Sequence, residues 1–143
     1  MLKTLTFIVA SASLASASLA AAGPGLAAET RLSAHLGGAG SPDTDGAGHA
    51  GFRIDSAKNE ICYDLSVEKI APATMAHIHK GAAGASGPVV VPLATPDAAG
   101  KASGCATAGQ PVVADILANP GGYYVNVHNA EHPGGAIRGQ LSK

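Results

Sequence analysis

The sequence has few aromatic residues and no excess of charge of either sign. Its 143 residues include no tryptophan, three tyrosines and two phenylalanines. With so few rings available, the core must be built from small and branched aliphatic side chains. Nine Lys and Arg residues face ten Asp and Glu residues, giving a formal net charge of −1. Because no basic field exists to hold a phosphate backbone by counterion release, we expect no nucleic-acid partner.

Familiar catalytic motifs are missing as well. No Gly-x-Ser-x-Gly elbow occurs, and the acidic residues are scattered singly instead of standing in pairs. The length and the unbroken composition indicate one domain with one core. Without such motifs the sequence gives no support for hydrolase chemistry, and a binding role is favoured over an enzymatic one.

The first 28 residues have the three parts of a secretory signal peptide. A positive start, MLK, precedes the apolar run TLTFIVASASLASASLAAA, and the small-residue segment GPGLAAET follows. We expect cleavage after Ala27 or Ala28, which leaves residues 29–143 as a periplasmic or extracellular domain. An uncleaved anchor is the alternative, but the many Ser and Ala residues make a poor membrane span. No cysteine precedes Cys62 that could carry a lipid anchor, so no membrane attachment is expected after cleavage.

The chain contains only two cysteines, Cys62 and Cys105. In an exported protein an even pair favours a disulfide over free thiols. A loop of this size would contribute roughly 4 kcal/mol in the chain-entropy model, as an upper figure. The alternative is that the thiolates bind a metal beside the histidines.

Period-2 alternation recurs along residues 29–143, whereas helical periodicity is nearly absent. Strands are predicted at 30–36, 49–55, 60–67, 75–79, 88–93, 122–128 and 136–141. Seven or so short strands with this spacing indicate an antiparallel sandwich or barrel. One helix of one or two turns is expected in VADILANP, residues 113–120, where Pro120 and Gly121 end it.

Two loops contain incomplete motifs. PDTDG, residues 42–46, has the opening of a calcium loop but lacks the further ligands and the closing glutamate, so a plain Asx-type turn is expected. KGAAGASG, residues 80–87, is not followed by a helix and lacks the ending of a phosphate loop. It is expected to be a flexible connection between two strands.

Two histidines, His77 and His79, stand two residues apart in MAHIH. On a strand they share one face with their Cα atoms roughly 6.6 Å apart, and two imidazoles can converge on one metal from that separation. If this strand neighbours YYVNVH in the sheet, His128 completes a site of three nitrogens. Neutral imidazoles suit copper or zinc better than calcium or magnesium. The sequence therefore predicts a metal site, with copper favoured and zinc as the second choice.

The remaining histidines have other assignments. His132, in the Pro-Gly loop that follows His128, is either an accessory ligand or exposed. His35 and His49, each alone on an early strand, are expected at the surface. The alternative to a metal site is that polar residues repeated on one strand face mark a solvent-exposed surface. The protein would then be a structural or protein-interaction domain without metal.

Two motifs resemble the CHRD domain: AHIHKGAAGASGPVVVPL and NPGGYYVNVHNAEHPGGAIRGQL. The resemblance extends over residues 29–143, with TDGAGHAGFRID and ICYDLSV matching more loosely. It implies an exported all-β protein with an immunoglobulin-like or superoxide-dismutase-like sandwich and no established enzymatic activity. The positions of Cys62 and Cys105 also look like those of members that carry a disulfide. No protein partner follows from it.

A weaker likeness is to Cu/Zn superoxide dismutase. His77-x-His79, a later cysteine, His128 and Arg138 are similar in order to the copper ligands, disulfide cysteine and active-site arginine of that family. No counterpart of its zinc-binding loop is found. The likeness therefore implies at most a copper-only oxidoreductase with Arg138 near the metal ligands. Otherwise Arg138 is expected to be a structural ion-pair partner in the last strand.

Overall fold

The structure is a computed structural model that describes residues 28–37 and 40–143. Residues 1–27, which hold nearly all of the expected signal peptide, lie outside the described residues. No helix in the described ranges is long and apolar enough to span a membrane.

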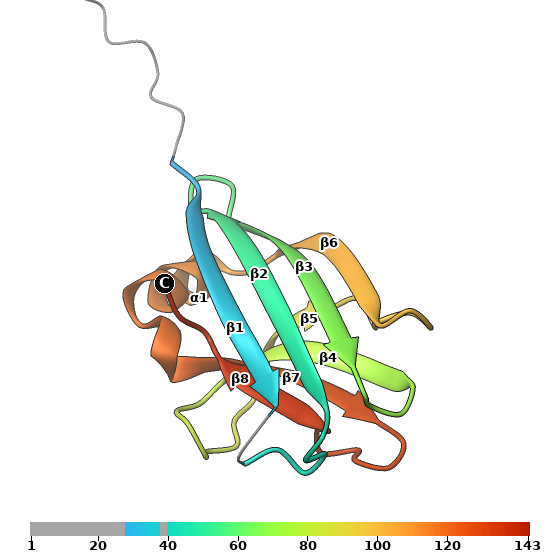
Figure 1. The fold of residues 1–143 in the computed structure, drawn as a ribbon. Helices are drawn as coiled ribbons and strands as arrows, with labels where there is room; N and C mark the ends of the chain where they lie inside the picture. The colour runs from blue at the N-terminus through green and yellow to red at the C-terminus, as the bar shows by residue number, and fades with distance from the viewer. Residues whose placement is uncertain (1–27, 38–39) are drawn as a thin grey trace, which may run out of the picture.

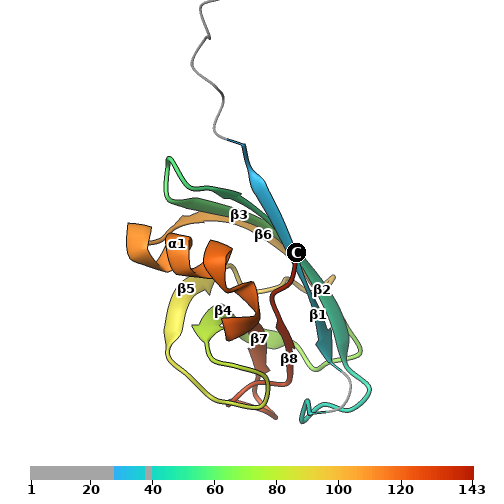
Figure 2. The ribbon, with the colours of Figure 1, turned by 90° about the vertical axis from the view of Figure 1, so that its left-hand side faces the viewer.

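The described chain forms two antiparallel sheets of four strands each (Figure 1). The first sheet has the order β1-β2-β3-β6, and the second has the order β5-β4-β7-β8. Figure 2 shows the two sheets face to face, with the helix α1 beside them. The predicted all-β sandwich is therefore confirmed. The strands are β1 (Thr30–Gly37), β2 (Ala47–Asp55), β3 (Glu60–Glu68), β4 (Ala73–Lys80), β5 (Val89–Leu93), β6 (Lys101–Thr107), β7 (Tyr123–Asn129) and β8 (Ile137–Gln140).

Period-2 alternation places the aliphatic side chains between the sheets. On β1, for example, Leu32, Ala34 and Leu36 are all buried, while Arg31 and His35, which alternate with them, are exposed. β2 and β3 repeat this pattern. The side chains that pack against them from the second sheet include Ile78 of β4 and Val125 and Val127 of β7. The core is mainly aliphatic, as predicted, and its aromatic members are Phe52, Tyr63 and Tyr123.

One strand, β6, was missed by the sequence analysis. Its sequence KASGCAT offers no large apolar side chain, and each of its residues is exposed or half-buried. It forms at the edge of the first sheet because it pairs with β3 from Glu60 to Ser66. Cys62 and Cys105 are direct partners in this pairing and form a disulfide, with Cα atoms 3.9 Å apart. Both sulfurs are thus engaged in a covalent bond, and neither is available as a thiolate ligand.

The expected helix is α1 (Gln110–Ala118), followed by a 3₁₀ turn, η1 (Pro120–Gly122). The helix begins three residues before the predicted segment, with Pro111 in its first turn, where a missing N–H costs nothing. Val113 and Ile116 point into the core. In the connection between β1 and β2, the backbone N–H of Gly46 donates to Asp43 Oδ1 at 3.1 Å, as expected for a local turn in PDTDG.

Strand β7 is buried along its whole length, on both faces. Its inner face packs in the core, and its outer face is covered by two loops, residues 81–88 and residues 130–136. Gly87 N–H donates to Tyr124 Oη at 3.2 Å, and Asn126 Nδ2 donates to the carbonyl of Gly134 at 3.1 Å. The segment KGAAGASG, predicted as a flexible connection, therefore joins two strands but also closes over the outer face of the second sheet.

Candidate metal centre

The register between β4 and β7 brings the three predicted histidines to one face. The cross-strand partners are His79 with Tyr124, His77 with Asn126, and Met75 with His128. Because partners on adjacent strands project to the same side, all these side chains lie on the outer face of the second sheet. The alternate residues Ala76 and Ile78 are buried in the core. A site of these three histidines requires β4 and β7 to be neighbours, and they are paired along their length.

The three imidazoles converge. His77 Nδ1 lies 3.2 Å from His128 Nε2, and one ring nitrogen from each of His77, His79 and His128 lies within 4.8 Å of the others. Two nitrogens bound at ~2.0–2.1 Å to a tetrahedral metal are about 3.3 Å apart. The His77–His128 separation is already close to this distance.

Hydrogen bonds to main-chain carbonyls fix two of the rings. His79 Nδ1 lies 2.9 Å from the carbonyl of Gly87, and His128 Nδ1 lies 2.9 Å from the carbonyl of Pro133. A carbonyl oxygen only accepts, so each Nδ1 carries the proton and each Nε2 presents a lone pair. Metal-binding histidines are usually oriented in this way, by donating the second ring N–H to a fixed acceptor.

The lone pair of His79 Nε2 has no hydrogen-bond partner among the described residues, although the atom is buried. The His79 side chain is 8% exposed. Leaving a buried polar atom unpaired costs on the order of 1–3 kcal/mol, so such atoms are rare and call for an explanation. His128 Nε2, in contrast, faces His77 Nδ1, which supplies a donor in the metal-free cluster. An ion between the rings would engage all three nitrogens.

Burial and the two neighbouring imidazoles favour the neutral form of His77. Burial first, and then the neighbouring imidazoles of His128 and His79, lower the pKa of His77 below its ordinary value of 6.5. Neutral imidazole is the form that binds metals. A donor set of nitrogen atoms without carboxylates suits copper or zinc and is poor for calcium or magnesium.

Tyr124 and Arg138 support the cluster from one side. The rings of His79 and Tyr124 are stacked, with centroids 5.0 Å apart and planes at 12°. The guanidinium carbon of Arg138 lies 3.4 Å from the centroid of Tyr124. Since β7 runs between β4 and β8, the tyrosine ring separates the arginine from the histidines. Arg138 therefore supports the cluster through Tyr124 and does not reach the imidazoles.

A main-chain carbonyl and a side-chain amide oxygen hold Arg138 in this position. Its guanidinium donates to the carbonyl of Ala85 at 2.8 Å and to Gln140 Oε1 at 3.3 Å. In the described ranges it forms no ion pair: the ion pairs found there are Arg53–Asp64, Lys58–Asp55 and Lys80–Asp115. The contribution of Tyr124 was not predicted, although its position two residues before Asn126 on the His128 face was visible in the sequence.

The other three histidines lie apart from this group. His132 is half-buried and is not among the residues whose ligand atoms converge. Its main chain shapes the loop, since its N–H donates to Asn129 Oδ1 at 2.7 Å. His35 and His49 are exposed, as predicted, and the β1–β2 register makes them direct partners with ring centroids 4.9 Å apart.

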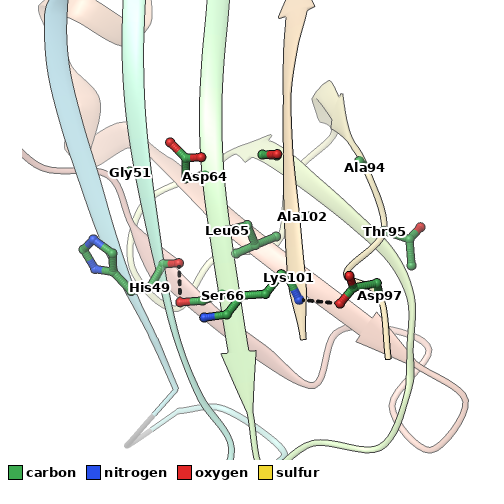
Figure 3. Close-up of a pocket in the computed structure, with 11 residues that line it drawn as sticks. His49, Gly51, Asp64, Leu65, Ser66, Ala94, Thr95, Asp97, Lys101 and Ala102 are labelled. Carbon is green, nitrogen blue, oxygen red and sulfur yellow. Dashed lines mark hydrogen bonds between the residues drawn. The ribbon is translucent and has the colours of Figure 1, made fainter. Parts of the chain in front are cut away.

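A groove of about 710 Å³ lies on the first sheet (Figure 3), and none of the three clustered histidines lines it. Its acidic side chains already have partners. Asp97 Oδ1 accepts from the backbone N–H of Lys101 at 2.9 Å, and Asp64 forms an ion pair with Arg53 at 3.1 Å. Within the described chain, it is not a place where three metal-binding side chains meet. A second possible ligand group in the described residues, Glu60 with Cys62 and Cys105, has both sulfurs in the disulfide, so the histidines of the second sheet are the candidate metal site.

Comparison with known proteins gives one match. A family model described as CHRD domain matches residues 32–141, which is most of the chain and includes all three clustered histidines. No curated protein and no solved structure matches significantly.

Proposed function

This chain belongs to the CHRD domain family, and we propose that it is an exported member that binds one metal ion, copper in preference to zinc, through His77, His79 and His128. Its role is in metal binding or homeostasis and not in catalysis. Two features support export: the N-terminal segment has the pattern of a signal peptide, and the Cys62–Cys105 disulfide is a bond typical of oxidising compartments.

The observation that carries the proposal is the state of His79. Its Nδ1 proton is donated to the Gly87 carbonyl, and its buried Nε2 has no hydrogen-bond partner among the described residues. One of its ring nitrogens lies within 4.8 Å of a ring nitrogen of His77 and of His128. A polar strand face that served only solubility would leave these atoms in water. Here the 81–88 loop keeps water away from one side of His79. Burying the Nε2 lone pair in this way costs free energy unless another group or an ion binds it.

Copper is favoured because of the donor set. Three neutral imidazoles match the preference of copper and zinc for nitrogen ligands, and copper binds nitrogen sites more tightly than zinc in the divalent series. The half-buried His77 leaves an approach from solvent, so the ion does not have to be trapped during folding.

The test is calorimetric titration of residues 29–143, which contain both sheets, without an affinity tag that could itself bind metal. We expect one equivalent of copper, and loss of tight binding when any one of His77, His79 and His128 is replaced by alanine. The double variant His35→Ala/His49→Ala is the matched control, because it removes two imidazoles from the first sheet and should bind as the wild type does.

Two results would contradict the proposal. One is wild-type affinity weaker than about 10 μM for both metals, where the binding free energy is only about −7 kcal/mol. The other is equal binding by all the variants. Either would favour an interaction domain without metal. The single variant His132→Ala decides whether the Pro-Gly loop adds a ligand.

A further inference from the structure

Strand β4 carries a third side chain on the face that holds His77 and His79. Met75 lies two residues before His77, and its cross-strand partner is His128. Cβ atoms of direct partners on adjacent strands are about 4.5–5.5 Å apart. Met75 therefore stands next to two of the three clustered histidines, one along its own strand and one across the sheet.

Exposure changes steadily along this face of β4. The Met75 side chain is 46% exposed, His77 is half-buried, and His79 is 8% exposed. The 81–88 loop closes the cluster at the His79 end, where Gly87 and Tyr124 lie. Met75 thus stands at the end of the cluster that is open to solvent, where an ion would enter.

Packing does not account for a methionine at this place. Met75 and Val89 are the two large hydrophobic side chains that the described residues leave exposed, and neither belongs to the core. A single exposed apolar residue is common on protein surfaces. What distinguishes Met75 is its thioether, a soft donor on a flexible side chain, placed beside imidazole nitrogens.

We propose that Met75 supplies a thioether ligand to the histidine centre and makes it selective for Cu(I). This inference rests on the proposed function, and it adds the oxidation state of the ion and a fourth donor. Thioether sulfur is a soft donor that favours Cu(I), whereas Cu(II) sites hold a methionine sulfur only as a weak, long contact. Zinc in proteins is bound by thiolate, imidazole and carboxylate groups, so a thioether adds little to its affinity. Met75 has three rotatable side-chain bonds that allow the sulfur to turn toward an ion held by His77 and His128. No redox step is required, because copper binds as Cu(I) and stays in that oxidation state.

The variant Met75→Leu tests the sulfur, because it keeps the size and apolar character of the side chain. Cu(I) affinity is measured without oxygen by competition with a chromophoric Cu(I) chelator, and zinc and Cu(II) affinities by titration. We expect Cu(I) affinity to fall at least about tenfold, or ~1.4 kcal/mol, with zinc and Cu(II) affinities nearly unchanged. X-ray absorption of the Cu(I)-loaded wild type should show a sulfur neighbour that the variant lacks.

Val89 provides the matched control. It is exposed, and it pairs with His79 after a register shift between β4 and β5, so it lies near the end of β4 that is farther from Met75. Val89→Ala removes apolar surface but no sulfur, and it should leave the preference for Cu(I) intact. If Val89→Ala and Met75→Leu weaken all metals alike, Met75 only shields the site and the inference is overturned.

The remaining outcomes separate this inference from the proposed function. Unchanged Cu(I) affinity in Met75→Leu, with binding still lost in His77→Ala, would overturn the thioether ligand and leave the three-histidine site standing. Absence of metal binding by the wild type would overturn both. A uniform loss of affinity caused by misfolding is recognised because Met75→Leu would then also lower the unfolding temperature of the metal-free protein.

Discussion

His77 Nδ1 and His128 Nε2 lie 3.2 Å apart, although 51 positions separate the two residues in the chain. The adjacency of β4 and β7 creates this contact, and the carbonyl of Pro133 orients the His128 ring. Without metal, the contact is a hydrogen bond in which one ring nitrogen donates to the other. In the proposed metal-bound form, the same two nitrogens would be ligands about 3.3 Å apart, so this pair would need little rearrangement to bind an ion.

The first prediction concerns the pH dependence of metal binding. Protons compete with metal for imidazole nitrogen, so the affinity should fall as pH decreases through the histidine range. Since burial and the neighbouring imidazoles lower the pKa of His77 below 6.5, this nitrogen remains available for metal at lower pH than an ordinary histidine. Titrations at pH 7.5, 6.5 and 5.5 should show most of the loss below about pH 6.5. Affinity that does not change over this range would contradict imidazole ligation.

The second prediction concerns the aromatic support of His79. Tyr124→Leu removes the stacked ring that separates Arg138 from the cluster, and we expect metal affinity to fall about 10-fold, as is typical when groups that orient metal ligands are lost. Tyr124→Phe is the control, because it keeps the ring and removes only the hydroxyl that accepts from Gly87. Calorimetric titration of the two variants measures the difference. Equal affinities would show that the ring does not position His79.

Much of this centre was accessible from the sequence. Alternation in MAHIH and YYVNVH assigns His77, His79 and His128 to the face opposite the apolar residues, and the small number of strands leaves few ways to arrange them. The carbonyls of Gly87 and Pro133 could not be foreseen, because a main-chain acceptor has no signature in residue type. For the same reason KGAAGASG was predicted only as a connection.

The missed strand β6 has a related cause. Its small side chains bury little surface, so hydrophobic periodicity, the main signal for a strand, is absent. What holds it in place is backbone pairing with β3 and the Cys62–Cys105 bond. The pairing of β6 with β3 depends on contact between segments that are far apart in the sequence. The seven residues of β6 alone therefore do not predict it.

The third prediction follows from that bond. The double variant Cys62→Ala/Cys105→Ala should lower the free energy of unfolding by about 2–4 kcal/mol, because the unfolded chain regains the freedom that the crosslink removed. Metal affinity should not change, since the disulfide lies in the first sheet and the histidines in the second. Chemical denaturation and copper titration measure the two quantities. A loss of copper binding in the folded variant would revive the idea of cysteine ligands.

The last prediction concerns the attachment of α1 to the second sheet. Asp115 Oδ2 accepts from Lys80 Nζ at 2.7 Å and also from the hydroxyl of Tyr123. The hydrogen bond from Lys80, and then the one from Tyr123, lower the pKa of Asp115 below its ordinary value of 3.8. A carboxyl group whose pKa is lower in the folded than in the unfolded chain stabilises the fold above the ordinary value, and this contribution disappears as pH falls through the folded value.

Asp115→Asn should therefore lower the unfolding temperature slightly at pH 7, by a few degrees at most, because both charged groups are partly exposed and solvent screens them. The difference from the wild type should shrink below pH 3.8 and vanish once Asp115 is protonated in the folded wild type as well. Thermal unfolding of the metal-free proteins at pH 7, 4 and 2.5 measures it. Asp64→Asn is the control, since its ion pair with Arg53 joins two strands of the first sheet and does not touch the helix. A difference at pH 7 that persisted undiminished at pH 2.5 would mean that Asp115 acts through its shape and its Tyr123 contact, and not through its charge.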